Sequence, residues 1–162
     1  MRAELKTAIE VLGDGRIVGL VGAGCSTRSG IPDYRGPETR RRARNPIRWQ
    51  QFAAKESTRK RYWARAMVGW PRFAAAEPNA AHRALAQLEE QGTLAGLITQ
   101  NVDRLHHRAG SRRVTELHGT LTEVRCLSCG AREHRQDLQE RLLERNPGFD
   151  RHAAEMAPDG DS

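Results

Sequence analysis

The chain has 162 residues, enough for one ordinary domain, and a formal net charge of +7. Its 38% apolar content without a long apolar run argues against a membrane-spanning protein, and its three cysteines are too few for a disulfide framework. The first residues show no pattern of a secretion signal or a transit peptide. We therefore expect a cytoplasmic protein with no membrane partner.

Apolar periodicity and turn residues predict helices that alternate with strands. The expected elements are a helix over 3–12, a strand over 16–22, a helix over 79–91, a strand over 94–99, a short helix over 102–109 and a strand over 113–117. Asn79 is the expected N-cap of the second helix, Gly92 lies just past its end, and Gly110 stops the third. Such alternation predicts an α/β fold with a parallel sheet.

The interval 36–78 interrupts this alternation and is predicted to be a loop followed by helices. We expect three of its aromatic residues, Trp49, Phe52 and Trp70, to form the core of a small helical module. The stretch from Arg35 to Arg72 holds 12 basic and 2 acidic residues. A solvated face is the simpler explanation of this charge, and attraction to the phosphates of a nucleotide or nucleic acid is the alternative.

The turn after the first strand carries Gly22, Ala23 and Gly24. Glycines at such a turn let backbone N–H groups approach a diphosphate closely, since no Cβ stands in the way. A bare Gly-x-Gly is a weak signal, because a plain strand-to-helix turn has the same pattern. The sequence SGIPDYR that follows, from Ser29 to Arg35, is too specific for a plain turn.

Further blocks follow in order along the chain. The sequence TQNVDRLH begins at Thr99, at the carboxyl end of a predicted strand, where ligands bind in open α/β sheets. The sequence ELHG begins at Glu116, and a Cys-x-x-Cys pair begins at Cys126. Together with the glycine turn, these blocks resemble the sirtuins, the NAD-dependent protein deacylases. The stretch from Arg61 to Asn79 further resembles their class II branch.

This resemblance implies a Rossmann-like parallel sheet with a helical insertion and the start of a small zinc-binding module. It covers nearly all of this chain, but the chain corresponds to only the first part of a sirtuin, so we expect an incomplete fold. The implied intervals are 1–35 for the first part of the NAD-binding domain, 36–78 for a cofactor loop and helical module, 79–119 for the continuation with the catalytic histidine, and 120–162 for the start of the zinc module with a polar tail.

The resemblance also implies roles for individual residues. The implied NAD-binding residues are Gly22, Ala23, Gly24, Ser26, Asp33, Tyr34, Arg35, Gln100, Asn101 and Asp103. His118 is the implied general base, because an imidazole exchanges protons near neutral pH. The chain has six histidines, and only its place in Glu-Leu-His-Gly singles His118 out.

Cys126 and Cys129 are implied as two of the four ligands of one structural zinc ion, and the sequence holds no second Cys-x-x-Cys pair. Tyr62 and Arg65, three residues apart on one face of a predicted helix, are implied contacts for an acidic or longer acyl group. For Arg65 an ordinary surface arginine is the alternative.

The implied reaction consumes NAD as a co-substrate and an acylated lysine side chain of a protein. Nicotinamide leaves, and His118 activates the ribose hydroxyl that takes over the acyl group, which gives O-acyl-ADP-ribose. Transfer of ADP-ribose to protein is a variant of this reaction. Two other hypotheses stay open: an inactive remnant that serves only as a binding module, and a small nucleic-acid-binding protein, the partner that we expect least.

Overall fold

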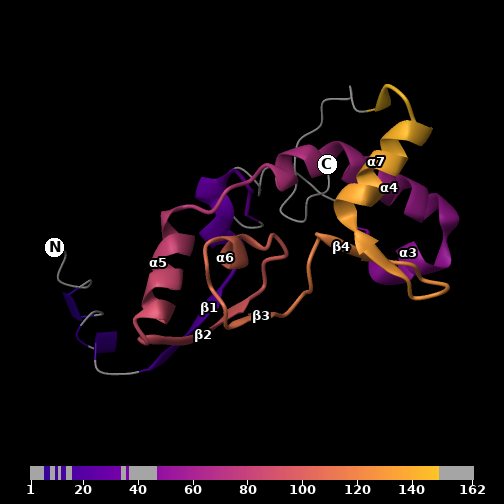
Figure 1. Cartoon of the computed structure of the whole chain (residues 1–162). Helices are drawn as coiled ribbons and strands as arrows, with labels where there is room; N and C mark the ends of the chain where they lie inside the picture. The colour runs from indigo at the N-terminus through magenta and orange to yellow at the C-terminus, as the bar shows by residue number, and fades with distance from the viewer. Residues whose placement is uncertain are drawn as a thin grey trace.

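The computed structural model describes residues 6–7, 10, 12–13, 16–33, 36 and 47–149. Its larger sheet has three parallel strands in the order β1-β2-β3. These strands are β1 (Ile17–Val21), β2 (Leu94–Thr99) and β3 (Val114–Glu116). The 3-10 helix η1 (Ala23–Ser29) follows β1, helix α5 (Ala80–Glu90) precedes and packs against β2, and the short α6 (Leu105–Arg108) follows β2 (Figure 1). The α/β fold with a parallel sheet is thus confirmed.

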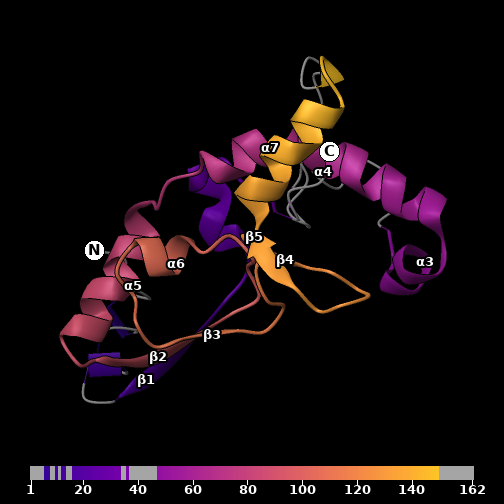
Figure 2. The same cartoon turned by 45° about the vertical axis from the view of Figure 1, so that its right-hand side comes forward.

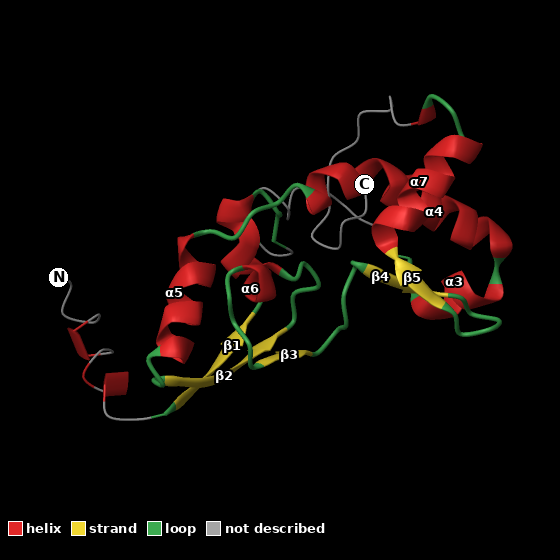
Figure 3. Cartoon of the chain, in the orientation of Figure 1, coloured by secondary structure: helices red, strands yellow, loops and turns green. Residues whose placement is uncertain are grey.

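A second group of elements lies at the other end of the molecule (Figures 2 and 3). It comprises α3 (Trp49–Ala54), α4 (Glu56–Ala74), an antiparallel hairpin of β4 (Glu123–Arg125) and β5 (Arg132–His134), and α7 (Arg135–Arg145). Helix α4 leads from α3 back to the sheet end, and α7 packs across α4. The sequence analysis did not predict the hairpin or α7.

The helix caps explain where the elements around the sheet begin and end. The Asn79 Oδ1 accepts hydrogen bonds from the N–H of Ala81 at 2.8 Å and of His82 at 3.4 Å, which confirms Asn79 as the N-cap of α5. Helix α6 begins at Leu105, later than expected, because the Asp103 carboxylate accepts the Leu105 N–H at 2.9 Å. Of the helix expected over 3–12, residues 6, 7, 10 and 12 are described, and these are helical.

The hydrophobic core joins the two groups of elements. Trp70 and Phe73, in the last turns of α4, and Ala76, just after it, pack with Ile31 and Leu105 from the sheet side. Trp70 therefore belongs to the core, as expected. The expectation for Trp49 was wrong: its side chain is 61% exposed, because α3 is a short end helix where only one side of the indole ring is covered. Phe52 is half-buried.

A buried arginine stabilises the contact between α7 and α4. Arg135 is 4% exposed, and its guanidinium lies 4.8 Å from the Trp70 ring centroid and 5.6 Å from that of Trp63. It donates a hydrogen bond to the Ala66 carbonyl at 3.1 Å. Burial lowers the pKa of Arg135 to about 10, so the side chain stays charged at neutral pH and α7 is held to α4 by a cation.

The two faces of β1 have different surroundings. On one face, the Leu97 side chain of β2 covers Gly19, and a Cβ added to Gly19 would come within 2.8 Å of it. On the other face, Val18 and Leu20 are 62% and 66% exposed. A strand of a parallel sheet is usually covered on both sides, and the described residues cover only one side of β1. No helix in the described ranges is long and apolar enough to cross a bilayer.

Candidate active site

The carboxyl ends of the three parallel strands meet at one edge of the sheet (Figure 1). There β1 leads into the glycine turn and η1, β2 leads into Gln100, Asn101 and Asp103, and β3 leads into His118. The structure thus brings three separate sequence blocks to the position where open α/β sheets bind their ligands. We refer to this region as the sheet edge.

Buried polar side chains hold the sheet edge together. The Ser26 hydroxyl, fully buried, donates a hydrogen bond to Asp103 Oδ2 at 2.6 Å and accepts one from Asn101 Nδ2 at 3.0 Å. Asn101 and Asp103 are themselves 7% and 8% exposed. Each group finds a partner inside the protein, so the loop after β1 is fixed to the loop after β2 before any ligand arrives. Contact of these three side chains with NAD stays a prediction.

His118 lies at the surface of this edge, and its geometry fixes one ring nitrogen. Its Nδ1 is 3.0 Å from the Gln100 carbonyl oxygen. A carbonyl only accepts, so Nδ1 carries the proton and donates it to this bond. In the neutral ring the free lone pair is then on Nε2. This is the tautomer in which Nε2 can accept a proton as a general base. This backbone contact of Gln100 was not predicted from the sequence, and its contact with the nicotinamide side of NAD stays a prediction.

The glycine turn is open on its outer side. A Cβ added to Gly22 or Gly24 would meet no described atom within 4 Å. Gly22 is extended, with φ −139° and ψ −169°, and Gly24 has no left-handed φ, so neither backbone conformation requires glycine. Neither packing within the described residues nor conformation explains these glycines, so this side of the turn has room for close approach of an outside group.

The remaining residues of the first block are only partly described. Asp33 is half-buried, and its Oδ1 accepts the Gly36 N–H at 2.6 Å, as in a tight turn. Tyr34 and Arg35, predicted to close over the cofactor, lie outside the described residues. Their role in NAD binding stays a prediction.

Beneath the glycine turn, the ligand atoms of Cys25, His82 and His106 lie within 4.8 Å of one another, the only such group of three potential metal ligands among the described residues. Burial, with the nearby Asp103 charge, raises the pKa of the Cys25 thiol. Burial also lowers the pKa of both histidines, that of His106 to about 4. All three groups are therefore held in their neutral forms.

This neutral group is not arranged as a metal site. The His82 Nδ1 accepts the Asn79 N–H at 3.2 Å, so the proton of the neutral ring must be on Nε2, which faces the Ser26 hydroxyl at 3.4 Å. His82 then has no free lone pair for a metal ion. Metal-binding histidines have the opposite arrangement, with the second nitrogen donating to an acceptor.

The Cys-x-x-Cys pair is in the turn of the β4–β5 hairpin. Both thiols are exposed, and Gly130, with φ +75°, lets the chain turn back so that its N–H bonds the Cys126 carbonyl at 3.0 Å. Hydrogen bonds from the backbone at Cys129 and Ser128 lower the pKa of the Cys126 thiol. The turn therefore favours a thiolate, the form that binds zinc, although two thiolates supply only half of a tetrahedral site.

Tyr62 and Arg65 lie on α4, and both are half-buried. The Tyr62 ring packs edge-on against Phe52, with ring centroids 5.1 Å apart. Tyr62 also lines a small cavity of about 140 Å³ together with Thr120, two residues after His118. Arg65 does not line this cavity. The structure brings Tyr62 near the segment of His118, and the substrate role of both residues stays a prediction.

With this geometry established, comparison with known proteins gives the family. A family model described as the Sir2 family matches residues 22–158. The chain belongs to the Sir2 family. The match confirms the sirtuin resemblance. It includes the glycine turn, the sequences that begin at Thr99 and Glu116, and the cysteine pair.

Named Sir2 relatives are similar over most of this chain. An NAD-dependent protein deacetylase of Xanthomonas axonopodis pv. citri is 53% identical over 147 residues, 91% of this chain and 50% of that protein. One of Bradyrhizobium diazoefficiens is 50% identical, over 91% of this chain and 54% of its own length. A solved Sir2 structure with a p53 peptide and NAD+ is 38% identical with a TM-score of 0.70, over 88% of this chain and 56% of that one. The chain thus spans about half the length of the curated relatives that it matches.

Three residues near the sheet edge have contacts or burial that the sequence did not reveal: Asn79, His82 and His106. Asn79 caps α5 and also donates through Nδ2 to the Cys25 carbonyl at 2.8 Å. The cap was visible in the sequence, but the contact with Cys25 joins residues 54 positions apart. The adjacent His106 and His107 differ in burial, which the helical spacing of such a short helix cannot show.

Proposed function

We propose that this chain is the NAD-binding and catalytic portion of an NAD-dependent protein-lysine deacylase that releases nicotinamide and O-acyl-ADP-ribose. The observation that carries the proposal is the His118 tautomer: its Nδ1–H is held by the Gln100 carbonyl, and its Nε2 is left as an acceptor. The names of the relatives, NAD-dependent protein deacetylases, support the same reaction.

Each part of the sheet edge has a task in this proposal. Backbone N–H groups of Gly22, Ala23 and Gly24 bind the diphosphate of NAD, because their outer side is open to close approach. Gln100, Asn101 and Asp103 place the nicotinamide ribose, with Ser26 fixing the two loops together. NAD supplies an activated ribose, and His118 accepts the proton of a ribose hydroxyl at Nε2.

Zinc is part of the proposal as a structural ion. The hairpin turn offers two thiols, Cys126 and Cys129, and the backbone donors around Cys126 favour the thiolate that zinc requires. No other described side chain completes a group of ligands with this pair. Zinc bound here would need two further ligands, and it would stabilise the hairpin without taking part in the reaction.

The proposed protein substrates are acylated lysine side chains. A solved Sir2 relative is bound to a p53 peptide, which supports a peptide substrate for this family member. Tyr62 and Arg65 are the proposed contacts for an acidic or longer acyl group, and Tyr62 lines a cavity near the His118 segment. A cytoplasmic location and the absence of nucleic-acid or membrane partners complete the proposal.

Nicotinamide release tests this function directly. The chain is incubated with NAD and an acetyl-lysine peptide, and nicotinamide is measured by chromatography, with the unacetylated peptide and His118→Ala as controls. We expect release over many turnovers that requires the acetyl group and is lost in His118→Ala, because His118 acts after the first nicotinamide has left. A preparation that is folded by circular dichroism and binds NAD, but releases no nicotinamide, would instead indicate a binding module.

A further inference from the structure

The segment that carries His118, residues 117–122, connects β3 to β4. Its backbone is hydrogen-bonded to residues 99–102. At its beginning, the Leu117 N–H donates to the Thr99 carbonyl at 2.9 Å. At its end, the Leu121 N–H donates to the Val102 carbonyl at 3.0 Å. Thr99 is the last residue of β2, and Val102 lies in the turn between β2 and α6. The position of His118 is therefore set by what fixes its segment to that turn.

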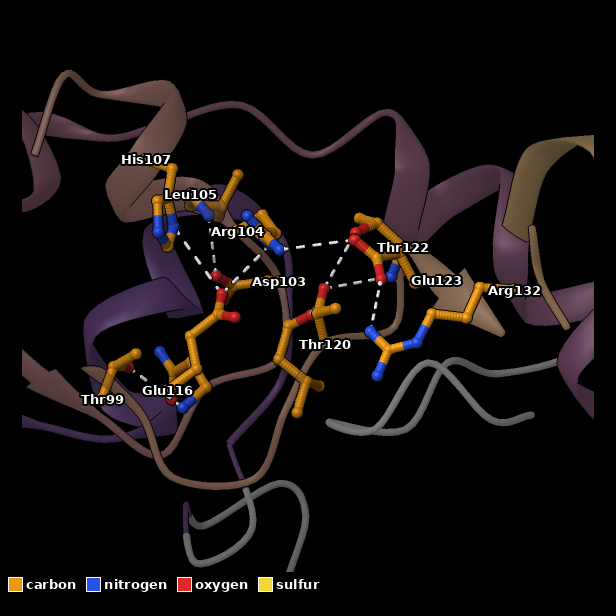
Figure 4. A network of polar contacts seen from close by, with 12 residues as sticks. Thr99, Asp103, Arg104, Leu105, His107, Glu116, Thr120, Thr122, Glu123 and Arg132 are labelled. Atoms are coloured by element: carbon orange, nitrogen blue, oxygen red, sulfur yellow. Dashed lines mark hydrogen bonds and ion pairs between the residues drawn. The ribbon is translucent and has the colours of Figure 1, made fainter. Parts of the chain in front are cut away.

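One side chain of that turn reaches both ends of the His118 segment. The Arg104 Nε is 3.2 Å from Glu116 Oε1, and its Nη2 is 3.8 Å from Glu123 Oε1 (Figure 4). Glu116 is the last residue of β3, and Glu123 is the first of β4. The His107 Nδ1 lies 3.6 Å from the same Glu116 oxygen. Arg104 thus connects the strand before His118 with the strand after it.

The two ion pairs of Arg104, with Glu116 and with Glu123, differ in strength. The Glu116 side chain is 17% exposed, so its charge is only partly hydrated and the short contact with Arg104 is little screened by water. The Glu123 side chain is 40% exposed, and Arg132 also reaches it, at 3.7 Å. Solvent and a second cation weaken the ion pair between Arg104 and Glu123. The contact with Glu116 therefore carries most of the effect.

The backbone of Arg104 supports a specific role for its side chain. With φ 61° and ψ 10°, it is the only non-glycine residue of the described chain with a positive φ. This conformation strains an ordinary residue, whereas glycine would adopt it freely. An arginine at this strained position is explained by the two carboxylates that its side chain reaches.

We propose that Arg104 is a positioning residue for His118 and acts through Glu116. Strand β3 has only three residues and, within the described ranges, pairs with β2 alone, so an additional contact would stabilise its end. The ion pair supplies that anchor two residues before His118, and it keeps the Nδ1–H directed at the Gln100 carbonyl. The inference rests on the proposed function, in which His118 is the general base.

The tautomer of His118 gives a test that does not require turnover. The chain is labelled with 15N-histidine, and the ring signals of His118 are assigned with His118→Ala. In the unchanged chain we expect the Nδ1–H tautomer to dominate. In Arg104→Gly and in Glu116→Met, which remove the two partners of the ion pair, we expect the Nε2–H form to become the major one. Arg104→Lys, which keeps a cation, should preserve the Nδ1–H form.

Arg132→Met is the matched control, because Arg132 contacts Glu123 but not Glu116. It should leave the tautomer unchanged, and thermal unfolding identifies any variant that is not folded. If folded Arg104→Gly or folded Glu116→Met keeps the Nδ1–H form, the proposal is wrong. Should Arg104→Gly not fold, Glu116→Met alone decides.

Kinetics separate this inference from the proposed function. If the chain releases nicotinamide, Arg104→Gly should lower kcat about 10-fold or more while the KM for NAD stays within about twofold, since only the base is displaced. Equal changes in KM and kcat/KM would contradict a positioning role. A chain that shows the tautomer change but no turnover would overturn the proposed function and leave the positioning of His118 by Arg104 supported.

Discussion

Two cysteines of this chain have opposite environments. Cys25 lies in η1 at the sheet edge, where burial and the Asp103 charge raise its pKa. Cys126 lies in the hairpin turn, where backbone donors lower its pKa. The sheet edge is closed by its own hydrogen bonds, while the hairpin offers two exposed thiols and lacks a complete ligand set among the described residues. The first region is held by contacts within the protein, whereas the second presents two exposed thiols.

The strongest way to break this comparison is to remove the centre of the sheet-edge network. Asp103→Leu leaves the Ser26 hydroxyl and the Leu105 N–H without their acceptor. We expect it to lower the free energy of unfolding by about 3 kcal/mol, measured by urea denaturation. Asp137→Leu, on the exposed first turn of α7, is the control and should change little. A cost for Asp103→Leu no larger than the control's would show that the edge is not preorganised.

The next prediction concerns pH. Folding lowers the pKa of His106 from 6.5 to about 4, mainly through burial and then through His82, whose pKa is also lowered. Between these two values the unfolded chain binds more protons than the folded one, so stability is complete above about pH 6.5 and is lost as the pH falls towards about 4. At about pH 5 the expected loss from His106 is about 2 kcal/mol.

Denaturation at about pH 7.5 and about pH 5, compared between the unchanged chain and His106→Leu, isolates this effect. Both ring nitrogens of His106 are buried without a hydrogen-bond partner among the described residues, so leucine should be tolerated at neutral pH. The variant should lose less stability on acidification than the unchanged chain. His134→Gln, at an exposed histidine, is the control and should lose as much stability on acidification as the unchanged chain. Equal acid sensitivity in His106→Leu would contradict the assignment.

A pair of glycine substitutions sharpens the contrast between structure and binding within the sheet edge. Gly19→Ala places a methyl group 2.8 Å from the Leu97 side chain and should cost about 1–2 kcal/mol of stability. Gly24→Ala meets no described atom within 4 Å, so stability should be unchanged. If the turn binds the NAD diphosphate, Gly24→Ala should weaken NAD binding about 10-fold by calorimetry. A destabilised Gly24→Ala with normal NAD binding would show that this glycine is structural.

The sequence predicted those parts of the sheet edge that depend on local chemistry. β2 was predicted with its observed bounds, and the Asn79 cap was confirmed, because apolar runs and capping residues act within a few positions. The expectation that Ser26 lines the diphosphate path stays a prediction, but the sequence did not reveal that its buried hydroxyl contacts Asn101 and Asp103, 75 and 77 positions away. Contacts of this kind are set by how the strands align.

The second group of elements was less predictable for a similar reason. The strands β4 and β5 have three residues each, too few for a period to be recognised. Trp49 was assigned to the core because tryptophan is usually buried, but its place on a short end helix leaves it exposed. The buried Arg135 contradicts the usual exposure of arginine, and the two tryptophan rings and the Ala66 carbonyl on α4 explain it.

The smallest expected effect returns to the two cysteines. Thiolates are the reactive form, so Cys126, exposed and with a lowered pKa, should react with iodoacetamide about 10-fold or more faster than Cys25, which is half-buried with a raised pKa. Mass spectrometry of digested protein measures both rates in one sample. Added Zn²⁺ should slow labelling of Cys126 and Cys129 and leave Cys25 unaffected, since the His82 tautomer gives the Cys25 group no metal affinity. Equal rates for Cys25 and Cys126, or protection of Cys25 by Zn²⁺, would show that the sheet edge is as open to metal as the hairpin, and the distinction between the two regions would not hold.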